Sequence, residues 1–455
     1  MADVEPARHK TPASFGASER NNLLAWSLLG VGVLAVAGVM ALLIAVSRIP
    51  GIEKLSIWPI DFFHRGLVIH VIFSFIVWFF AVFGALLSYG TASERPKNGL
   101  AGKTGVWLAV IACLLLAVSA FSGDGVASLN NYVPVIIDPV FYAGLLVLGL
   151  ALILQIVCFV AGIGAHGRAR PPLVTMTGIA AIVFVIAAVC LIQAYFLGRG
   201  EALDEAYNEQ LFWGFGHILQ FMNVALLIGA WAYLAEDCGH PIPHAAITVA
   251  GALLVLAALA GPLFYGSFEP FSASQTLAFT NLQYAMAPPS VLVAFLVCMA
   301  LWRGRHSHPR RNPAFLGLSL SIAVFGIGGF LGLFVDGADT RTPAHYHGVI
   351  AGINLAFMGL YYALFLPALN KSIEMTKTIY AQFILFAGGQ TFAAIGLFWA
   401  GGYGAPRKVA GADQGLSAIG GYIGMFMNGI GALIAIIGGV MFIWTIARAL
   451  LKKSR

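Results

Sequence analysis

Long apolar runs constrain this chain more than any other feature of its sequence. Of its 455 residues, 60% are hydrophobic and only 10% carry a charge. A run of about 20 apolar residues is long enough, as an α-helix, to cross the hydrocarbon core of a bilayer, and this chain holds many such runs. The sequence therefore predicts an all-α, polytopic membrane protein built as a helix bundle, with the lipid bilayer as its surroundings. It offers no support for nucleic-acid binding.

Twelve membrane spans can be placed along the chain. They are expected at residues 22–47, 66–89, 104–122, 139–162, 174–197, 211–235, 245–266, 275–302, 312–335, 345–370, 378–400 and 418–447. Prolines interrupt the pattern between residues 245 and 302, which we interpret as two spans. Because most connections are short, we expect one twelve-helix membrane domain at 22–447, with tails at 1–21 and 448–455.

Lysine and arginine gather in alternate polar segments, and this asymmetry predicts the orientation of the chain. The basic segments are the two tails and the second, fourth, eighth and tenth connections, whereas the fifth connection is acidic through Glu201, Asp204, Glu205 and Glu209. The basic residues include Arg8, Lys10, Lys103, Arg303, Lys371, Lys377, Arg448 and Lys452. We therefore expect a multi-pass protein of the inner (plasma) membrane with both termini in the cytoplasm.

Four histidines lie within predicted spans that contain no Asp, Glu, Lys or Arg. They are His70, His217, His345 and His347, and the predicted orientation brings all four near the outer face. An ionisable side chain in hydrocarbon is costly and indicates function by default. A packing histidine is the alternative for any one of them alone. Four at one depth favour metal or heme ligation, because neutral imidazole binds a metal without a counter-charge.

The spacing of His345 and His347 is informative. Two residues two places apart on a helix lie about 200° apart, at roughly 100° per residue. The two imidazoles therefore point to opposite sides of one helix and are poorly placed to share one small ion. The spacing suits two large planar metal cofactors, one on each flank of the helix.

Three segments resemble the catalytic subunit I of the heme–copper oxidases, a family that includes cytochrome c oxidase subunit I and the large subunit of nitric oxide reductases. The first runs from Gly328-Gly329-Phe330 through Asp336 and Thr340 to Ala344-His345-Tyr346-His347-Gly348-Val349 and Tyr361-Tyr362; the others are Trp213-Gly214-Phe215-Gly216-His217 and Gly404-Ala405-Pro406-Arg407-Lys408. Histidines on the second, sixth and tenth of twelve spans repeat the layout of that family.

The resemblance implies two hemes. His70 and His347 would be the axial ligands of a low-spin heme, and His345 the proximal ligand of a high-spin heme whose distal side His217 would face. The implied function is a respiratory oxidoreductase of the terminal oxidase or nitric oxide reductase type. Electrons would pass through the low-spin heme to the high-spin heme, where O2 or NO binds and is reduced. His64, at the edge of span two, is an interface histidine or an alternative to His70 as ligand.

The resemblance also implies partners on the outer face. Arg407 and Lys408 would pair with heme propionates, for which a solvated loop charge pair is the alternative. Five cysteines stand singly with no Cys-x-x-Cys-His motif, so this chain carries no covalently attached c-type heme. We therefore expect an electron donor outside this chain, of the cytochrome or cupredoxin-like kind.

One part of the family pattern is absent. The family places two adjacent histidines on span seven to complete a copper or non-heme iron site, but Leu263-Phe264-Tyr265 stands there. His240 and His244 lie at the other end of that span, and Phe221 replaces the polar residue expected four places after His217. Tyr265 and Glu269 are the nearest polar candidates for that site, and Tyr265 is more readily interpreted as an interfacial aromatic residue. The sequence thus leaves open whether copper or non-heme iron is bound.

One further expectation follows from the polar residues. The inner halves of the spans offer only neutral groups such as Gln155, Gln220, Asn223 and Gln382, so we expect no carboxylate-based proton pumping.

Two alternatives to the oxidase stay open. One is a non-catalytic di-heme cytochrome that binds or senses a gas or transfers electrons, and the other is a twelve-span transporter.

Overall fold

A computed structural model describes the chain at residues 16–47, 62–91, 99–121, 125–163, 170–304, 312–335, 337, 339–409 and 411–452. Residues 1–15, which include Arg8 and Lys10 of the N-terminal tail, and Asp336 of the first motif lie outside the described residues. Within the described ranges, twelve helices are long and apolar enough to cross a membrane, as the sequence predicted.

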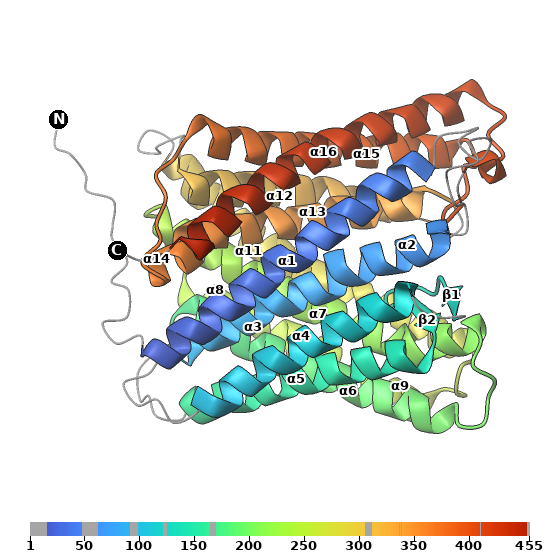
Figure 1. The fold of residues 1–455 in the computed structure, drawn as a ribbon, viewed down its shortest axis with the longest axis horizontal. Coiled ribbons are helices and arrows are strands. Elements are labelled where there is room, and N and C mark those ends of the chain that lie inside the picture. The colour runs from blue at the N-terminus through green and yellow to red at the C-terminus, as the bar shows by residue number, and fades with distance from the viewer. Residues whose placement is uncertain are drawn as a thin grey trace. The chain divides into compact units, whose positions relative to one another are not determined.

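The helices group into two units by their contacts, one formed by residues 1–30 and 76–308 and the other by residues 31–75 and 309–455. Helix α1, Ala17–Ser47, contributes to both, and so does the span formed by α2, Phe62–Val71, the π-helical segment η2, Ile72–Val77, and α3, Trp78–Gly90. Figure 1 shows the course of these helices along the chain.

The first unit contains the spans from α4 to α11. Its remaining elements are α4 Gly99–Phe121, β1 Val126–Ser128, β2 Val135–Ile137, α5 Pro139–Ile163, α6 Pro172–Leu197, α7 Glu205–Asp237, α8 His244–Ala258, α9 Ala260–Ser267, α10 Ala273–Leu282, η3 Gln283–Met286 and α11 Ala287–Arg303. Strands β1 and β2 form an antiparallel hairpin with Val126 opposite Ile137. The region with many prolines forms two spans, as expected, with α8 and α9 meeting at Leu259.

The second unit contains the last four spans. Its remaining elements are α12 Pro313–Leu331, η4 Gly332–Phe334, α13 Arg341–Leu360, η5 Tyr361–Phe365, α14 Leu366–Ala368, α15 Lys377–Gly402, η6 Gly411–Gln414 and α16 Ile419–Leu451. Helices α12 and α13 pack against each other, and so do α15 and α16 (Figure 1). Segment η5 is a π-helix inside the span of α13, and such segments are frequent at functional sites.

The helices that carry the four span histidines are the most buried spans. Within the most apolar stretch of each span, 94% of the residues are buried in the α7 span, 78% in the α13 span and 72% in the α2–α3 span. The corresponding fraction is 50% or less in each of the other described spans. Helix α7 also begins six residues before its predicted start at 211. The reason is an N-cap: the side chain of Asp204 accepts a 2.8 Å hydrogen bond from the backbone N–H of Tyr207.

Glycines let α12 and α13 approach at backbone distance. A Cβ atom added to Gly328 would lie 2.4 Å from the backbone nitrogen of Val349, and one added to Gly348 would lie 2.6 Å from Cα of Gly328. Small residues at membrane helix interfaces allow such close packing, which supplies the attraction that the hydrophobic effect does not provide in lipid. The contact matters because it fixes α13, which carries His345 and His347, against α12.

We predict that Gly328→Ala destabilises the protein in detergent, because the new methyl group meets the backbone of α13 and forces the two helices apart. The expected loss is about 1–3 kcal/mol, the usual effect of overpacking. Gly329→Ala is the matched control on the next residue, where an added Cβ meets no atom within 4 Å. Thermal unfolding of both purified variants checks this, and equal midpoints would contradict the proposed contact.

Candidate functional site

His345 on α13 is held by the end of α12. Its Nδ1 lies 2.8 Å from the carbonyl oxygen of Gly328, which belongs to the last turn of α12, where carbonyl groups have bonding capacity not used within the helix. The imidazole fits only because residue 332 is glycine: a Cβ there would lie 2.6 Å from His345 Nδ1. Two glycines of α12 and η4 thus set the position of this ring.

His70 on α2 is held in the same way by α1. Its Nδ1 lies 3.0 Å from the carbonyl oxygen of Ala37. A carbonyl oxygen can only accept a hydrogen bond, so in both His70 and His345 the proton sits on Nδ1 and the lone pair on Nε2. Histidines that bind metals characteristically donate their other ring N–H to a carbonyl or carboxylate, which fixes both tautomer and orientation. This tautomer leaves Nε2 as the ring nitrogen through which each residue would bind a metal.

His347 lies one residue beyond Tyr346, and the two rings stack with centroids 5.3 Å apart. The sequence predicted four buried histidines. Of these four, only His217 is fully buried, with 1% of its surface exposed, and His70, His345 and His347 are half-buried. Partial exposure is compatible with ligation, since a ligating ring has to keep one edge free of protein atoms. His64 is exposed, as expected for an interface residue.

Arg407 and Lys408 follow α15 in a loop that is tied to the start of α13. Asp339 and Pro406 form an isolated antiparallel bridge, and the backbone N–H of Thr340 donates a 3.0 Å hydrogen bond to the carbonyl of Ala405. Lys408 has a left-handed backbone with φ of 64°. The loop is thus anchored a few residues before His345 in the chain, so the predicted propionate pair and the predicted heme ligands belong to one unit.

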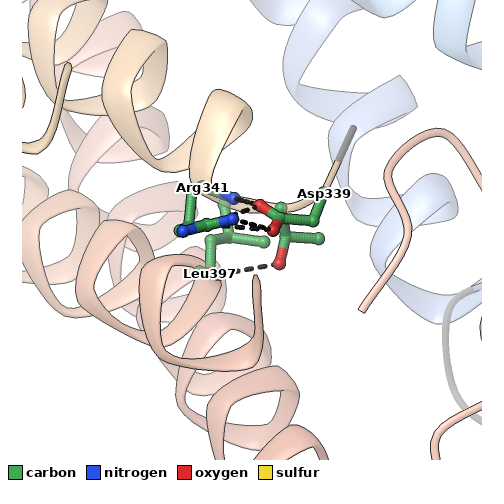
Figure 2. Close-up of polar contacts among 4 residues, drawn as sticks. Asp339, Arg341 and Leu397 are labelled. Atoms are coloured by element: carbon green, nitrogen blue, oxygen red, sulfur yellow. Dashed lines mark hydrogen bonds and ion pairs between the residues drawn. The ribbon is translucent and has the colours of Figure 1, made fainter. Parts of the chain in front are cut away.

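A second charged pair lies at the same point and was not predicted from the sequence. Arg341, the first residue of α13, forms an ion pair with Asp339 through Nη2 at 2.7 Å and donates from Nε to the same carboxylate (Figure 2). Thr340, between them, donates to the carbonyl oxygen of Leu397 on α15 at 2.7 Å. A Cβ at Gly401 would lie 2.8 Å from Asp339 Oδ1, so a glycine again makes room.

His217 on α7 has both ring nitrogens in contact with other groups of the protein. Its Nδ1 lies 2.8 Å from the carbonyl oxygen of Trp213, one turn earlier, so Nδ1 carries the proton and Nε2 the lone pair. The hydroxyl of Tyr132 lies 3.0 Å from Nε2 and donates to it. This tyrosine belongs to the β1–β2 hairpin, and the sequence analysis did not identify it.

Tyr132 occupies a strained backbone position. Its φ is 63°, and it is the central residue of a three-residue turn in which the N–H of Val133 donates to the carbonyl of Asn131 at 2.7 Å. Such γ-turns with positive φ are rare. Asn131 is in turn fastened to α7, because its backbone N–H and its side-chain amide donate to the two carboxylate oxygens of Glu209 at 2.7 and 2.6 Å. A Cβ at Gly216 would lie 2.3 Å from Cβ of Tyr132.

Aromatic side chains surround His217. Its ring centroid lies 4.6 Å from that of Trp213 and 5.9 Å from that of Phe279. Tyr265, interpreted from the sequence as an interfacial aromatic, is instead buried at 7% exposure and packs on Phe279 at 5.6 Å. The interfacial interpretation was wrong because α9 turns this residue inward, where its hydroxyl lies against Gly214 of α7.

A cavity of about 200 Å³ adjoins this cluster within the first unit. Trp213, Tyr265, Phe271 and Phe279 supply aromatic walls, and the polar lining is Asn131, Glu209, Gln210, Gln275 and Thr276. Trp213 and Phe279 therefore contact both the cavity and the ring of His217. The cavity lies beside the Tyr132–His217 pair.

The donors expected for a metal at His217 are not assembled there. Residues 263–265 hold no histidine, Phe221 is fully buried, and Glu269 is exposed. His244 lies at the start of α8, with its Nε2 2.9 Å from the carbonyl oxygen of Arg170. Throughout the described ranges, no group of three or more His, Cys, Asp or Glu side chains is arranged to hold a metal ion.

Comparison with known proteins identifies the family. Residues 23–441 match the family described as cytochrome c and quinol oxidase polypeptide I. The chain belongs to this family. The predicted resemblance to heme–copper oxidase subunit I is thereby confirmed, and so is a multi-pass membrane protein.

Several relatives extend along most of the chain. An uncharacterized protein of Rickettsia prowazekii is 26% identical with 96% of each chain covered, and one of Aquifex aeolicus is 27% identical over 80% of this chain and 88% of its own. Cytochrome c oxidase subunit 1 of Thermus thermophilus is 25% identical over 86% of this chain and 77% of its own. A structure of a heme–copper terminal oxidase dimer shares the fold, with a TM-score of 0.79, 18% identity and coverage of 97% and 85%.

The family generally binds hemes, and the residues of this chain fit that group. His70 and His345 each have Nδ1 fixed on a carbonyl, and both rings are half-buried. The residues do not fit the additional copper or iron of the family pattern. Only His217 of the predicted ligand set is present, and its Nε2 already accepts a hydrogen bond.

We predict that Asp339→Asn lowers stability by about 1–3 kcal/mol, because it removes the carboxylate charge that the guanidinium of Arg341 binds through Nε and Nη2. Asp413→Asn is the control, since Asp413 is exposed in η6, and exposed substitutions usually change stability by less than about 0.5 kcal/mol. Thermal unfolding in detergent measures both. A loss no larger than the control's would show that the Asp339–Arg341 pair does not stabilise the start of α13.

Proposed function

We propose that this chain is a heme-containing membrane oxidoreductase of the terminal oxidase type. The observation that carries the proposal is the pair of carbonyl contacts that fix Nδ1 of His70 and His345 and leave Nε2 as the lone-pair nitrogen. Family membership supports an oxidoreductase over the transporter alternative. A relative named cytochrome c oxidase subunit 1 supports O2 as the gas substrate, with NO as the other candidate.

In this proposal His70 and His347 would together hold a low-spin heme, and His345 would hold a high-spin heme. When bound, heme would supply one-electron transfer and gas binding. The opposite directions of His345 and His347 on one helix allow α13 to hold one group on each flank. The Gly328 and Ala37 carbonyls raise the basicity of the ligating nitrogens and hold their planes.

Arg407 and Lys408 are proposed to pair with heme propionates. Their loop is tied to the residues that precede α13. A planar guanidinium can donate two parallel hydrogen bonds to one carboxylate, so Arg407 would be the stronger partner of the two. The Asp339–Arg341 ion pair supports this arrangement by fastening the start of α13, which lies on the other side of the bridge.

The proposed orientation has both termini in the cytoplasm of a cell bounded by the inner (plasma) membrane, with the tails 1–21 and 448–455 on that side. The distribution of basic residues supports it. Electrons would then arrive from a cytochrome or cupredoxin-like donor at the outer face. Among the described residues the buried carboxylates are Glu19 and Asp339, both next to helix starts. This supports turnover without carboxylate-based proton pumping.

A second candidate function is a di-heme membrane cytochrome that binds a gas, senses it, or only transfers electrons. The specific observation in its favour is the Tyr132–His217 hydrogen bond at the position that resembles the family's first non-heme metal ligand. O2 and NO consumption by the purified, reduced protein separates the two. Turnover supports the oxidase, and gas binding without turnover supports the cytochrome.

We predict that His347→Leu removes the low-spin heme and lowers the heme count from two to one per chain, while CO still binds to the remaining heme. His345→Leu should do the reverse and abolish the CO-difference spectrum, because the two residues serve different hemes. Reduced-minus-oxidised and CO-difference spectra with heme counts on the same samples make the comparison. If either substitution removed both signals while the protein stayed folded, the two-heme arrangement would be refuted.

A further inference from the structure

The donor set around His217 is too small for a metal. The predicted family site needs three imidazoles, and His217 is the one present. If a metal displaced the proton of Tyr132, the phenolate would be a second donor. The carboxylate of Glu209 holds Asn131 through both of its oxygens, and among the described residues no three His, Cys, Asp or Glu side chains are arranged to hold a metal ion. Two donors fall short of the three or four protein ligands typical of copper, iron or zinc sites.

The lone pair that a metal would need is already used. Nδ1 of His217 donates to the Trp213 carbonyl and leaves Nε2 as the only acceptor on the ring, and the Tyr132 hydroxyl donates to it at 3.0 Å. Both polar ends of a ring with 1% exposure are therefore satisfied within the protein. A buried polar group with its hydrogen bonds complete is stable as it stands, and removing one partner is expensive.

Tyr132 is held in place against local backbone strain. This indicates that its contact with His217 is a specific feature of the fold and does not arise from chance packing. A bulky residue with φ of 63° in a γ-turn is unfavourable by itself, and such strain persists only where the surroundings enforce it. Here the enforcement comes from the two Asn131–Glu209 hydrogen bonds and from Gly216, which leaves room for the Tyr132 side chain against α7. The ring centroids of Tyr132 and His217 are 4.5 Å apart.

We propose that the His217 site is an organic site, formed by the hydrogen bond between the side chains of Tyr132 and His217, in place of a metal site. The phenol of Tyr132 takes the position of the ion, keeps His217 neutral with its proton on Nδ1, and excludes copper and non-heme iron from Nε2. Tyr132 is thus a positioning residue for His217, and Glu209 positions Tyr132 through Asn131. The inference concerns the first unit alone and goes beyond the proposed heme function, which rests on histidines of the second unit.

The first experiment counts metals. Purified protein loaded with excess copper and then washed should hold less than 0.1 copper and less than 0.1 non-heme iron per chain, and His217→Ala should give the same values. One equivalent of either metal that disappears in His217→Ala would overturn the inference. An equivalent that survives in His217→Ala would lie elsewhere and would support it.

The second experiment observes the pair itself and does not depend on activity. In protein labelled with ring-¹⁵N histidine, the His217 resonances, identified by their absence in His217→Gln, should show a protonated Nδ1 and a hydrogen-bonded, unprotonated Nε2. Tyr132→Phe keeps the ring and removes the hydroxyl, so the Nε2 resonance should move toward the value of a free acceptor. An unchanged Nε2 resonance in Tyr132→Phe would overturn the assignment of Tyr132.

Glu209→Gln tests how the tyrosine is held. A glutamine has one acceptor oxygen where the carboxylate has two, so it can keep only one of the two bonds from Asn131 and should loosen the turn. The Nε2 resonance should then shift part of the way toward its position in Tyr132→Phe. Glu205→Gln is the matched control, because Glu205 is exposed one turn earlier on α7. Equal spectra for the two variants would remove Glu209 from the proposal.

The two proposals fail in different ways. A metal at His217 would overturn the organic site and leave the hemes of His70, His345 and His347 untouched. A protein without heme would overturn the proposed function, while the resonances of the Tyr132–His217 pair could still be measured on the same sample.

Discussion

The hydrogen bond from an imidazole Nδ1 to a backbone carbonyl underlies the chemistry of this protein. Hydrocarbon offers no water to a polar ring, so each span histidine has to find its partner inside the protein. His70 and His345 find it on a neighbouring helix, and His217 finds it on its own helix one turn earlier. The bond fixes the tautomer in each case. The chemistry possible at each ring then depends on which group contacts Nε2.

Close packing of α12 on α13 brings the Gly328 carbonyl within reach of His345. Gly328 lies against Gly348 at backbone distance, and Gly332 leaves space for the ring of His345. The same device recurs where α15 and α16 meet, with Gly389 against Ala435. In a bundle surrounded by lipid, such contacts provide the van der Waals attraction between helices. The small residues in this part of the chain therefore join the helices and also set the position of the His345 ring.

The sequence predicted the features that depend on local composition and missed those that depend on contacts distant in the chain. The lengths of the apolar runs and the alternating basic segments were enough to predict the twelve spans. The four histidines could be picked out because ionisable residues are rare inside such spans. Tyr132 could not be found in this way, because it lies 85 residues from His217 in an ordinary polar loop. Tyr265 was misread for a related reason, since the direction in which α9 turns it is set by packing on Phe279.

One ring arrangement thus serves two chemical ends. An imidazole whose Nδ1 is fixed on a carbonyl can ligate heme iron through Nε2, as proposed for His70 and His345. With a phenol donating to Nε2, as at His217, the same imidazole is a hydrogen-bond partner instead. The difference comes from a single loop, whose strained turn is sustained by Glu209 and Gly216. A chain of this family can therefore retain the helix that carries its first non-heme ligand position and still replace the metal with a side chain. Any reduction of a gas by such a protein would have to rely on heme and on hydrogen bonds from organic groups.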